Sequence, residues 1–105
     1  MEVIYATEAV NNFYWSLETD VRSRTERLVG MLRTYGYQLR LPHLRPLGSG
    51  LFELRLNGKH AVRLLYCYAE GGAYIVHAVV KKQGALLRRE IEYAQHVRQS
   101  VVAQL

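Results

Sequence analysis

The chain has 105 residues, of which 50% are hydrophobic and 22% charged, and its formal net charge is +5. This length and apolar content indicate a single globular domain over residues 1–105, and they exclude two conventional domains and an intrinsically disordered chain. Eleven of the fourteen cations are arginine. Because arginine can bind phosphates and carboxylates through two parallel hydrogen bonds, the composition favours an anionic partner.

Several classes of site are excluded by what the sequence lacks. One cysteine, Cys67, is too few for an intrachain disulfide or a cysteine-rich zinc site. Histidines and carboxylates show no metal-ligand spacing, and glycine-rich phosphate loops are missing, so we expect neither metal nor cofactor. The first residues do not resemble a signal peptide, and no apolar run is long enough to cross a bilayer. We therefore expect a cytoplasmic protein that makes no membrane contact.

The charge is unevenly distributed along the chain. Residues 1–39 contain four cations and five anions, a net charge of −1, whereas residues 40–105 contain ten cations and four anions, a net charge of +6. We expect the basic surface to come mainly from the second part and the first part to serve as scaffold.

The first part of the chain predicts a short strand followed by two helices. Val3 to Tyr5 is typical of a strand, and Thr7 is a suitable N-cap for the helix that follows. A break near Thr19-Asp20 supplies the cap for a second helix, which Gly36 ends. The residues with helical spacing in the two helices are Val10, Phe13, Tyr14 and Leu17, then Val21, Leu28, Leu32 and Tyr35. We expect an αα-hairpin with Tyr14 and Tyr35 in its core.

The second part predicts an antiparallel meander and a last helix. Pro42 and Pro46 bracket a non-helical stretch, and Gly48-Ser49-Gly50 is a turn. Strand alternation begins at Leu51, and Asn57-Gly58 is typical of a two-residue hairpin turn. A second strand, a turn at Gly71-Gly72 and a third strand from Tyr74 to Lys82 follow. After Gly84, a helix presents one apolar face, formed by Leu87, Ile91, Ala94, Val97 and Val101. The order predicts an α+β domain: an N-terminal helical hairpin packed on a small antiparallel sheet of three or four strands, with a C-terminal helix.

Alternation along these strands separates apolar from charged residues. The residues expected to face the helical hairpin are Phe52, Leu54, Val62, Leu64, Val76 and Ala78. Those expected on the opposite face are Glu53, Arg55, Arg63, His77 and Lys81. This charged face is either an anion-binding site or a solvated sheet face, and the pattern alone does not decide between them.

Three segments, residues 47–55, 61–66 and 77–94, follow one another in an order and spacing that resemble those of the RelE/HigB family of bacterial and phage toxins. Leu47-Gly48-Ser49-Gly50-Leu51-Phe52-Glu53-Leu54-Arg55 is similar to the family's L-x-x-G-L-[WY]-E-L-R segment, and Ala61-Val62-Arg63-Leu64-Leu65-Tyr66 is similar to its y-R-[IV]-[LI]-Y strand. His77-Ala78-Val79-Val80-Lys81-Lys82-Gln83, with Glu90-Ile91-Glu92-Tyr93-Ala94, resembles its h-a-F-x-K-K … E-I-x-x-A segment. Together they cover nearly the whole chain and point to the phage-derived, HigB-like branch of the RelE/ParE superfamily. Two features depart from the pattern: Val79-Val80 replaces an aromatic residue, and the linker after Lys82 has no proline.

The resemblance implies a toxin of a type II toxin–antitoxin system that cleaves mRNA on the ribosome. An RNA 2′-hydroxyl can attack its own adjacent phosphate, so such an enzyme needs a base, cations for the phosphoryl charge and a proton donor, but no metal. Arginine stays protonated and is unsuited as the base, whereas neighbouring cations lower the pKa of a lysine. We hypothesise that Arg55 and Arg63 hold the phosphate and that Lys81 or Lys82 assists proton transfer.

Further polar residues are candidates for substrate binding. They are Arg45, His77, Arg88, Tyr93, His96 and Arg98. His77 is a candidate acid or base, or else a hydrogen-bonded core residue. Tyr93 is a candidate for stacking on an unpaired base, whereas Tyr66 shares the parity of Leu64 and is expected to pack in the core.

Two other function classes fit the same sequence. One is a gyrase-directed toxin of the ParE type, and the other is a toxin-derived module that binds a partner or RNA without activity. The expected partners are mRNA on the ribosome and a cognate antitoxin with a helix-turn-helix.

Overall fold

The computed structural model describes residues 1–58, 61–81 and 85–105. Its elements follow the order β1 (Val3–Tyr5), α1 (Glu8–Ser16), α2 (Thr19–Tyr35), the 3-10 helix η1 (Gly36–Gln38), β2 (Leu44–Gly48), β3 (Leu51–Leu56), β4 (Ala61–Ala69), β5 (Gly72–Lys81) and α3 (Arg88–Ala103). The α+β class and the C-terminal helix are confirmed. Within the described residues, no helix is both long and apolar enough to cross a membrane.

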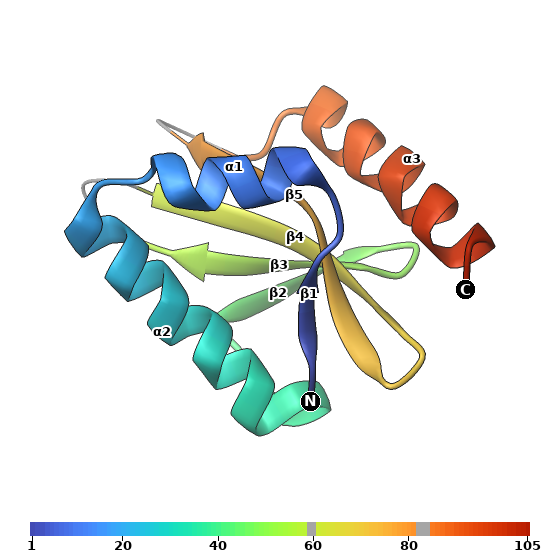
Figure 1. Cartoon of the computed structure of the whole chain (residues 1–105), viewed down its shortest axis with the longest axis horizontal. Helices are drawn as coiled ribbons and strands as arrows, with labels where there is room; N and C mark the ends of the chain where they lie inside the picture. The colour runs from blue at the N-terminus through green and yellow to red at the C-terminus, as the bar shows by residue number, and fades with distance from the viewer. Residues whose placement is uncertain (59–60, 82–84) are drawn as a thin grey trace.

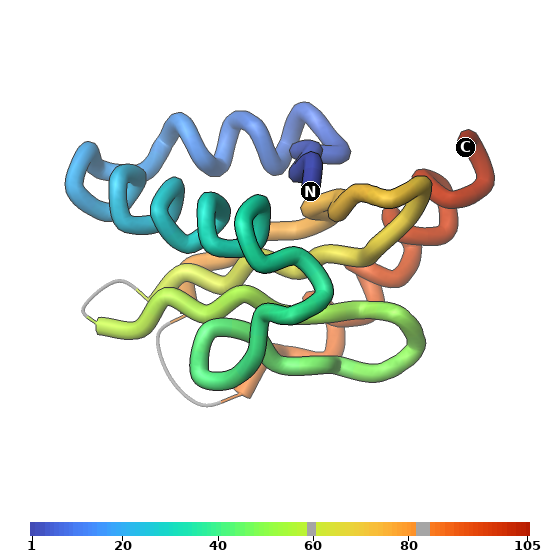
Figure 2. Tube along the Cα trace, turned by 90° about the horizontal axis from the view of Figure 1, so that it is seen from below, coloured from blue at the N-terminus to red at the C-terminus, as the bar shows by residue number. Residues whose placement is uncertain are grey.

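Local sequence accounts for the start of the first helix but not for the start of the second. The Thr7 hydroxyl accepts a hydrogen bond from the backbone N–H of Val10 at 3.2 Å, which satisfies one of the free donors at the start of α1. The predicted cap at Thr19-Asp20 is wrong: both residues lie inside α2, and Glu18 occupies the N-cap position without a side-chain cap bond. The two helices form the expected hairpin on one face of the sheet (Figures 1 and 2).

Five strands form one sheet in the order β1-β5-β4-β3-β2. Strands β2 to β5 are antiparallel neighbours. The chain reverses after Leu56 as expected, but the two-residue turn predicted at Asn57-Gly58 is wrong, because Leu56 pairs with Val62 and β4 begins only at Ala61. Strand β1 pairs with β5 in parallel, so the sheet is mixed and not purely antiparallel. Strand β2 occupies the stretch around Pro46 that was expected only to be non-helical; an edge strand tolerates proline because one side of its backbone needs no partner.

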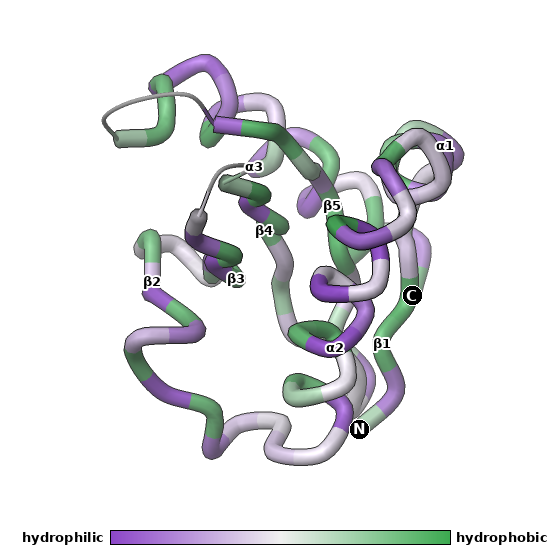
Figure 3. The backbone as a smooth tube through the Cα atoms, turned by 90° about the vertical axis from the view of Figure 1, so that its left-hand side faces the viewer, coloured by the Kyte–Doolittle hydropathy of each residue, from purple (hydrophilic) through white to green (hydrophobic). Residues whose placement is uncertain are grey.

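Two hydrophobic clusters lie on opposite faces of the sheet. Residues of α1 and α2 pack against Leu54, Val62 and Leu64, whereas α3 packs against Leu51, Leu65 and Cys67. In Figure 3, β2, β3 and β4 lie to one side of α1 and α2. Tyr66 is fully buried in the first cluster, as expected.

A bulge in β5 overturns one part of the predicted alternation. The register between β4 and β5 shifts where Leu65 pairs with His77 and Tyr66 pairs with Ile75. Val76 is the extra residue of the bulge. It was predicted to face the helical hairpin, but it packs in the cluster under α3. Ile75 takes its place on the hairpin side.

Two apolar side chains at helix ends are exposed, contrary to expectation. Tyr35 is the last residue of α2 and is 53% exposed, because the buried face of the helix passes through Val29 and Leu32 to Gly36. Leu87 is 54% exposed and precedes the first residue of α3, so it does not contribute to the apolar face of that helix.

Candidate functional site

Three charged side chains meet on the sheet face opposite α1 and α2. Glu53 and Arg55 point to this face from β3, and Arg63 points to it from β4, where it pairs in register with Arg55. The Glu53 carboxylate is within 3.5 Å of Nε of Arg55 and 3.6 Å of Nε of Arg63. Glu53 is only 3% exposed, so one buried carboxylate is shared by two guanidinium groups. The alternation therefore brings these residues together as predicted.

Arg63 is buried and its donors are engaged within the protein. Its terminal nitrogens donate to the backbone carbonyls of Leu56 and Val62 at 2.9 and 3.1 Å, and to Oδ1 of Asn57 at 3.1 Å. Burial lowers the pKa of the guanidinium from its usual value, against the opposing effect of the Glu53 carboxylate. This geometry favours a positioning role, in which Arg63 fixes the β3–β4 turn and the Glu53 carboxylate.

Arg55 differs from Arg63 in its access to solvent. Its side chain is 29% exposed, and its Nε is buried without a hydrogen bond. Among the described residues, the terminal nitrogens of Arg55 have no hydrogen-bond partner. Arg55 thus presents free donors at the rim while Glu53 holds its inner end.

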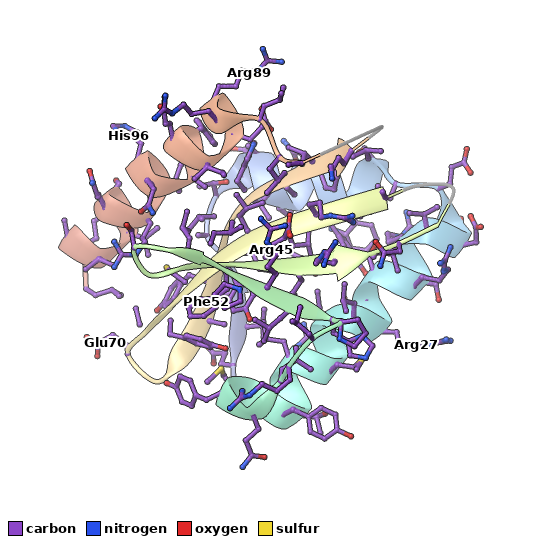
Figure 4. All side chains as sticks on the ribbon, turned by 180° about the vertical axis from the view of Figure 1, so that it is seen from behind. Arg27, Arg45, Phe52, Glu70, Arg89 and His96 are labelled. Carbon is purple, nitrogen blue, oxygen red and sulfur yellow. The ribbon has the colours of Figure 1, made fainter. Side chains whose placement is uncertain are left out.

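Arg45 and Lys81 complete a recess around these three residues. Arg45 pairs in register with Glu53 from the edge strand β2, and Lys81 is the last residue of β5. Both line a recess of about 50 Å³ together with Glu53, Arg55 and Arg63, and Leu86 and Ile91 close one side of it. In Figure 4 this sheet face points to the viewer, with Arg45 over the sheet and α3 to one side. We call these residues the cationic recess: Arg45, Glu53, Arg55, Arg63 and Lys81.

The cationic recess is suited to binding a phosphate at its rim. It contains four cations and one carboxylate, which leaves three positive charges, and its arginines come from adjacent strands of a rigid sheet. Hydrogen bonds between a guanidinium and a phosphate are charge-assisted and favour two parallel contacts. No group of three histidine, cysteine or acidic side chains that could hold a metal occurs in the described part of the chain.

His77 and Tyr93 lie together, but at a separate place. Nε2 of His77 is 2.8 Å from Oε2 of Glu90 on α3, and the ring of Tyr93 meets the imidazole edge-on with centroids 4.7 Å apart. These side chains line a cavity of about 410 Å³ between α1 and α3. The hydrogen bond fits the expectation of a partnered histidine on β5.

The remaining predicted residues are dispersed, or lie outside the described ranges. Arg88 is 92% exposed and pairs with Glu92, and Arg98 lies against Gly50 at the turn between β2 and β3, the end of β3 remote from Arg55. His96 points away from the sheet on the outer side of α3 (Figure 4). Lys82 lies outside the described residues.

Glu53 belongs to this site, although the sequence analysis assigned no role to it. Its signal was present, because it shares the parity of Arg55 and precedes it by two residues. A carboxylate on a strand face with two arginines is expected to pair with them once that face is partly covered.

A family model described as "Phage derived protein Gp49-like (DUF891)" matches residues 13–99. The match extends from α1 to α3 and includes every residue of the cationic recess. The chain belongs to this family. No curated protein matches the chain. As a member of the phage-derived Gp49-like family, the protein carries its recess inside the region that defines the family.

Proposed function

We propose that this protein is the toxin of a type II toxin–antitoxin system and that it cleaves mRNA on the translating ribosome. The observation that carries the proposal is the cationic recess, in which a buried carboxylate holds two arginines beside Lys81 at one open edge. Membership of a phage-derived family and the resemblance of its strands to RelE/HigB toxins support the same conclusion.

The reaction we propose uses the RNA's own 2′-hydroxyl as nucleophile. A base removes the 2′ proton, the bond from O2′ to phosphorus forms, and the bond from phosphorus to O5′ breaks as O5′ receives a proton. The products are a 2′,3′-cyclic phosphate and a 5′-hydroxyl. The negative charge that gathers on the phosphoryl oxygens is what the protein must stabilise.

The residues of the recess have different parts in this proposal. Arg55, whose side chain is 29% exposed, contacts the phosphoryl oxygens, and Arg45 at the edge strand holds a neighbouring phosphate. Lys81, at the rim of the recess, assists proton transfer; Lys82 stays a candidate for the same step. Glu53 and Arg63 act through Arg55 by fixing its orientation.

A masking partner follows from the same charge. The recess has a net positive charge and belongs to a chain that is basic overall, so it attracts nucleic acids of any sequence. The toxin therefore requires an antitoxin that covers or neutralises the recess. The resemblance suggests an antitoxin with a helix-turn-helix. A short neighbouring reading frame with such a pattern is the expected genetic context.

Induced expression in a bacterial host tests the proposal. The wild-type chain should arrest growth and protein synthesis without inducing a DNA-damage response, and Arg55→Gln should abolish the arrest. A matched variant, Arg33→Gln, removes the same charge from α2 at an exposed ion pair and should leave the arrest intact. DNA damage in place of translation arrest would assign the protein to the gyrase-directed class. If expression caused no arrest at all, the proposal would be wrong and the protein would be a binding module without toxin activity.

A further inference from the structure

A second basic cleft lies beside the cationic recess, between α2 and the end of β3. It has a volume of about 300 Å³ and is lined by Arg24 and Arg27 from α2, by His43, and by Arg55. Leu28 and Met31 are among its apolar lining residues. We call it the α2 cleft. Arg24 and Arg27 belong to the part of the chain with a net charge of −1, which gave no sign of a basic site.

The arginines of the α2 cleft are held open to solvent. Nη2 of Arg24 donates to the backbone carbonyl of Asn57 at 3.2 Å, which ties α2 to the β3–β4 turn, and the residue as a whole is exposed. Arg27 extends from α2 at the outer rim (Figure 4). The backbone N–H of Arg55 donates to the carbonyl of His43 at 2.9 Å and fixes the opposite wall. Among the described residues that line this cleft, none is acidic.

The α2 cleft and the cationic recess share one lining residue. Arg55 lines both of them. On the far side of the recess, Lys81 also lines a third cavity of about 540 Å³, which includes Arg89. Arg55 and Lys81 therefore each belong to two neighbouring cavities, and the third cavity also contains the carboxylate of Glu90.

We propose that the α2 cleft binds phosphates of the same single-stranded RNA whose reacting phosphate lies at the cationic recess. This inference rests on the proposed function. A single strand offers a phosphate at each nucleotide, so it can meet Arg55 and the α2 arginines together. The apolar floor of Leu28 and Met31 suits a ribose or an unpaired base, and such floors recur in grooves that bind single strands.

Binding of a fluorescein-labelled, fully 2′-O-methylated oligoribonucleotide of about ten nucleotides tests the α2 cleft. The methyl groups block cleavage, so fluorescence anisotropy reports affinity alone. At low salt the double variant Arg24→Gln/Arg27→Gln should bind about tenfold more weakly than the wild type. The slope of its log affinity against log salt should also be shallower by about 0.7 for each phosphate that the variant no longer neutralises. Arg33→Gln, on the same helix but outside the cleft, should bind like the wild type.

The possible failures of the two proposals differ. Equal affinity and equal salt dependence in the wild type and the double variant would overturn the α2 cleft as an RNA site, as would a wild type that does not bind the oligonucleotide. If the double variant lost binding to an acidic protein partner but bound RNA like the wild type, the cleft would be a binding site for that partner. That result would also overturn the proposed RNA site. The proposed function fails on different evidence, namely the absence of translation arrest and mRNA cleavage in cells that express the wild type.

Discussion

On the sheet face that α1 and α2 cover, β3 and β4 present apolar side chains along their whole length, whereas on the opposite face they change from apolar to charged part-way along. Leu51 is 1% exposed beneath α3, and two and four residues further along β3 the same face presents Glu53 and Arg55. Strand β4 repeats the change between Leu65 and Arg63. One face therefore holds the fold together, and the other combines a smaller core with a site.

The comparison also shows how a charged cluster tolerates burial. A carboxylate and a guanidinium lose hydration when a face is covered, and only polar partners within the protein compensate for that loss. Glu53 and Arg63 have such partners and are buried, while Arg55 and Lys81 extend to the rim. The inner pair supplies rigidity, and the outer cations supply contact with a ligand.

The largest stability effect is expected on the apolar face. Leu54 is fully buried beneath the helical hairpin, so Leu54→Ala removes packed methyl groups and leaves a cavity. We expect the free energy of unfolding to fall by about 3 kcal/mol in urea denaturation. The adjacent variant on the other face, Arg55→Gln, should change it by less than about 1 kcal/mol. Equal losses at both positions would show that the two faces contribute alike to stability.

A smaller effect is expected at the buried carboxylate. Glu53→Gln keeps the shape of the side chain but leaves Arg63 buried beside a neutral group. We expect a loss of about 2 kcal/mol at neutral pH, measured by urea denaturation. An unchanged free energy of unfolding would mean that Glu53 does not stabilise the arginines.

The pH dependence of stability tests burial on both faces. Burial raises the pKa of the Cys67 thiol above 9.0 on the face under α3, and it raises the pKa of Tyr66 above 10.0 on the face under the hairpin. Because the folded pKa is the higher one, the stabilisation is complete below the unfolded pKa and is lost as the pH rises toward the folded pKa. The free energy of unfolding should fall by up to about 1.4 kcal/mol per pH unit for each group.

Two variants separate these contributions. Cys67→Ala should flatten the dependence from about pH 9 upward, and Tyr66→Phe should flatten it from about pH 10 upward. Denaturation midpoints at several pH values measure both slopes. A slope that neither variant changes would contradict the burial of these groups.

The smallest effect is expected at the exposed pair on α2. Arg33 and Glu26 are each 43% exposed, so water screens their attraction. Arg33→Gln should change the free energy of unfolding by about 0.5 kcal/mol or less. A larger loss would disqualify this variant as the matched control for the charge changes proposed above.

Much of the fold follows from local sequence signals. Thr7 and the alternation from Leu51 predict the start of α1 and the two faces of the sheet. Asn57-Gly58 predicts where β3 ends but not the length of the connection to β4. The parallel pairing of β1 and the bulge at Val76 were not predictable, because each depends on residues distant in the chain. The site was also predicted in part, because strand alternation placed Arg55, Arg63 and Lys81 on one face of the sheet. The position of Arg24 and Arg27 near Arg55 depends on how α2 packs and could not be predicted from the sequence.

We propose that the charged half of the sheet face catalyses the cleavage of mRNA by the RNA's own 2′-hydroxyl. Cleavage of a defined mRNA on programmed ribosomes tests it most directly, with a second mRNA that carries one 2′-deoxynucleotide at the mapped cleavage position. The wild type should cut the first mRNA to a 2′,3′-cyclic phosphate and spare the second at that position. Arg55→Gln should cut at least about a hundredfold more slowly, as expected when a charge-stabilising donor is lost. Equal cleavage of both mRNAs, or full activity in Arg55→Gln, would contradict the account.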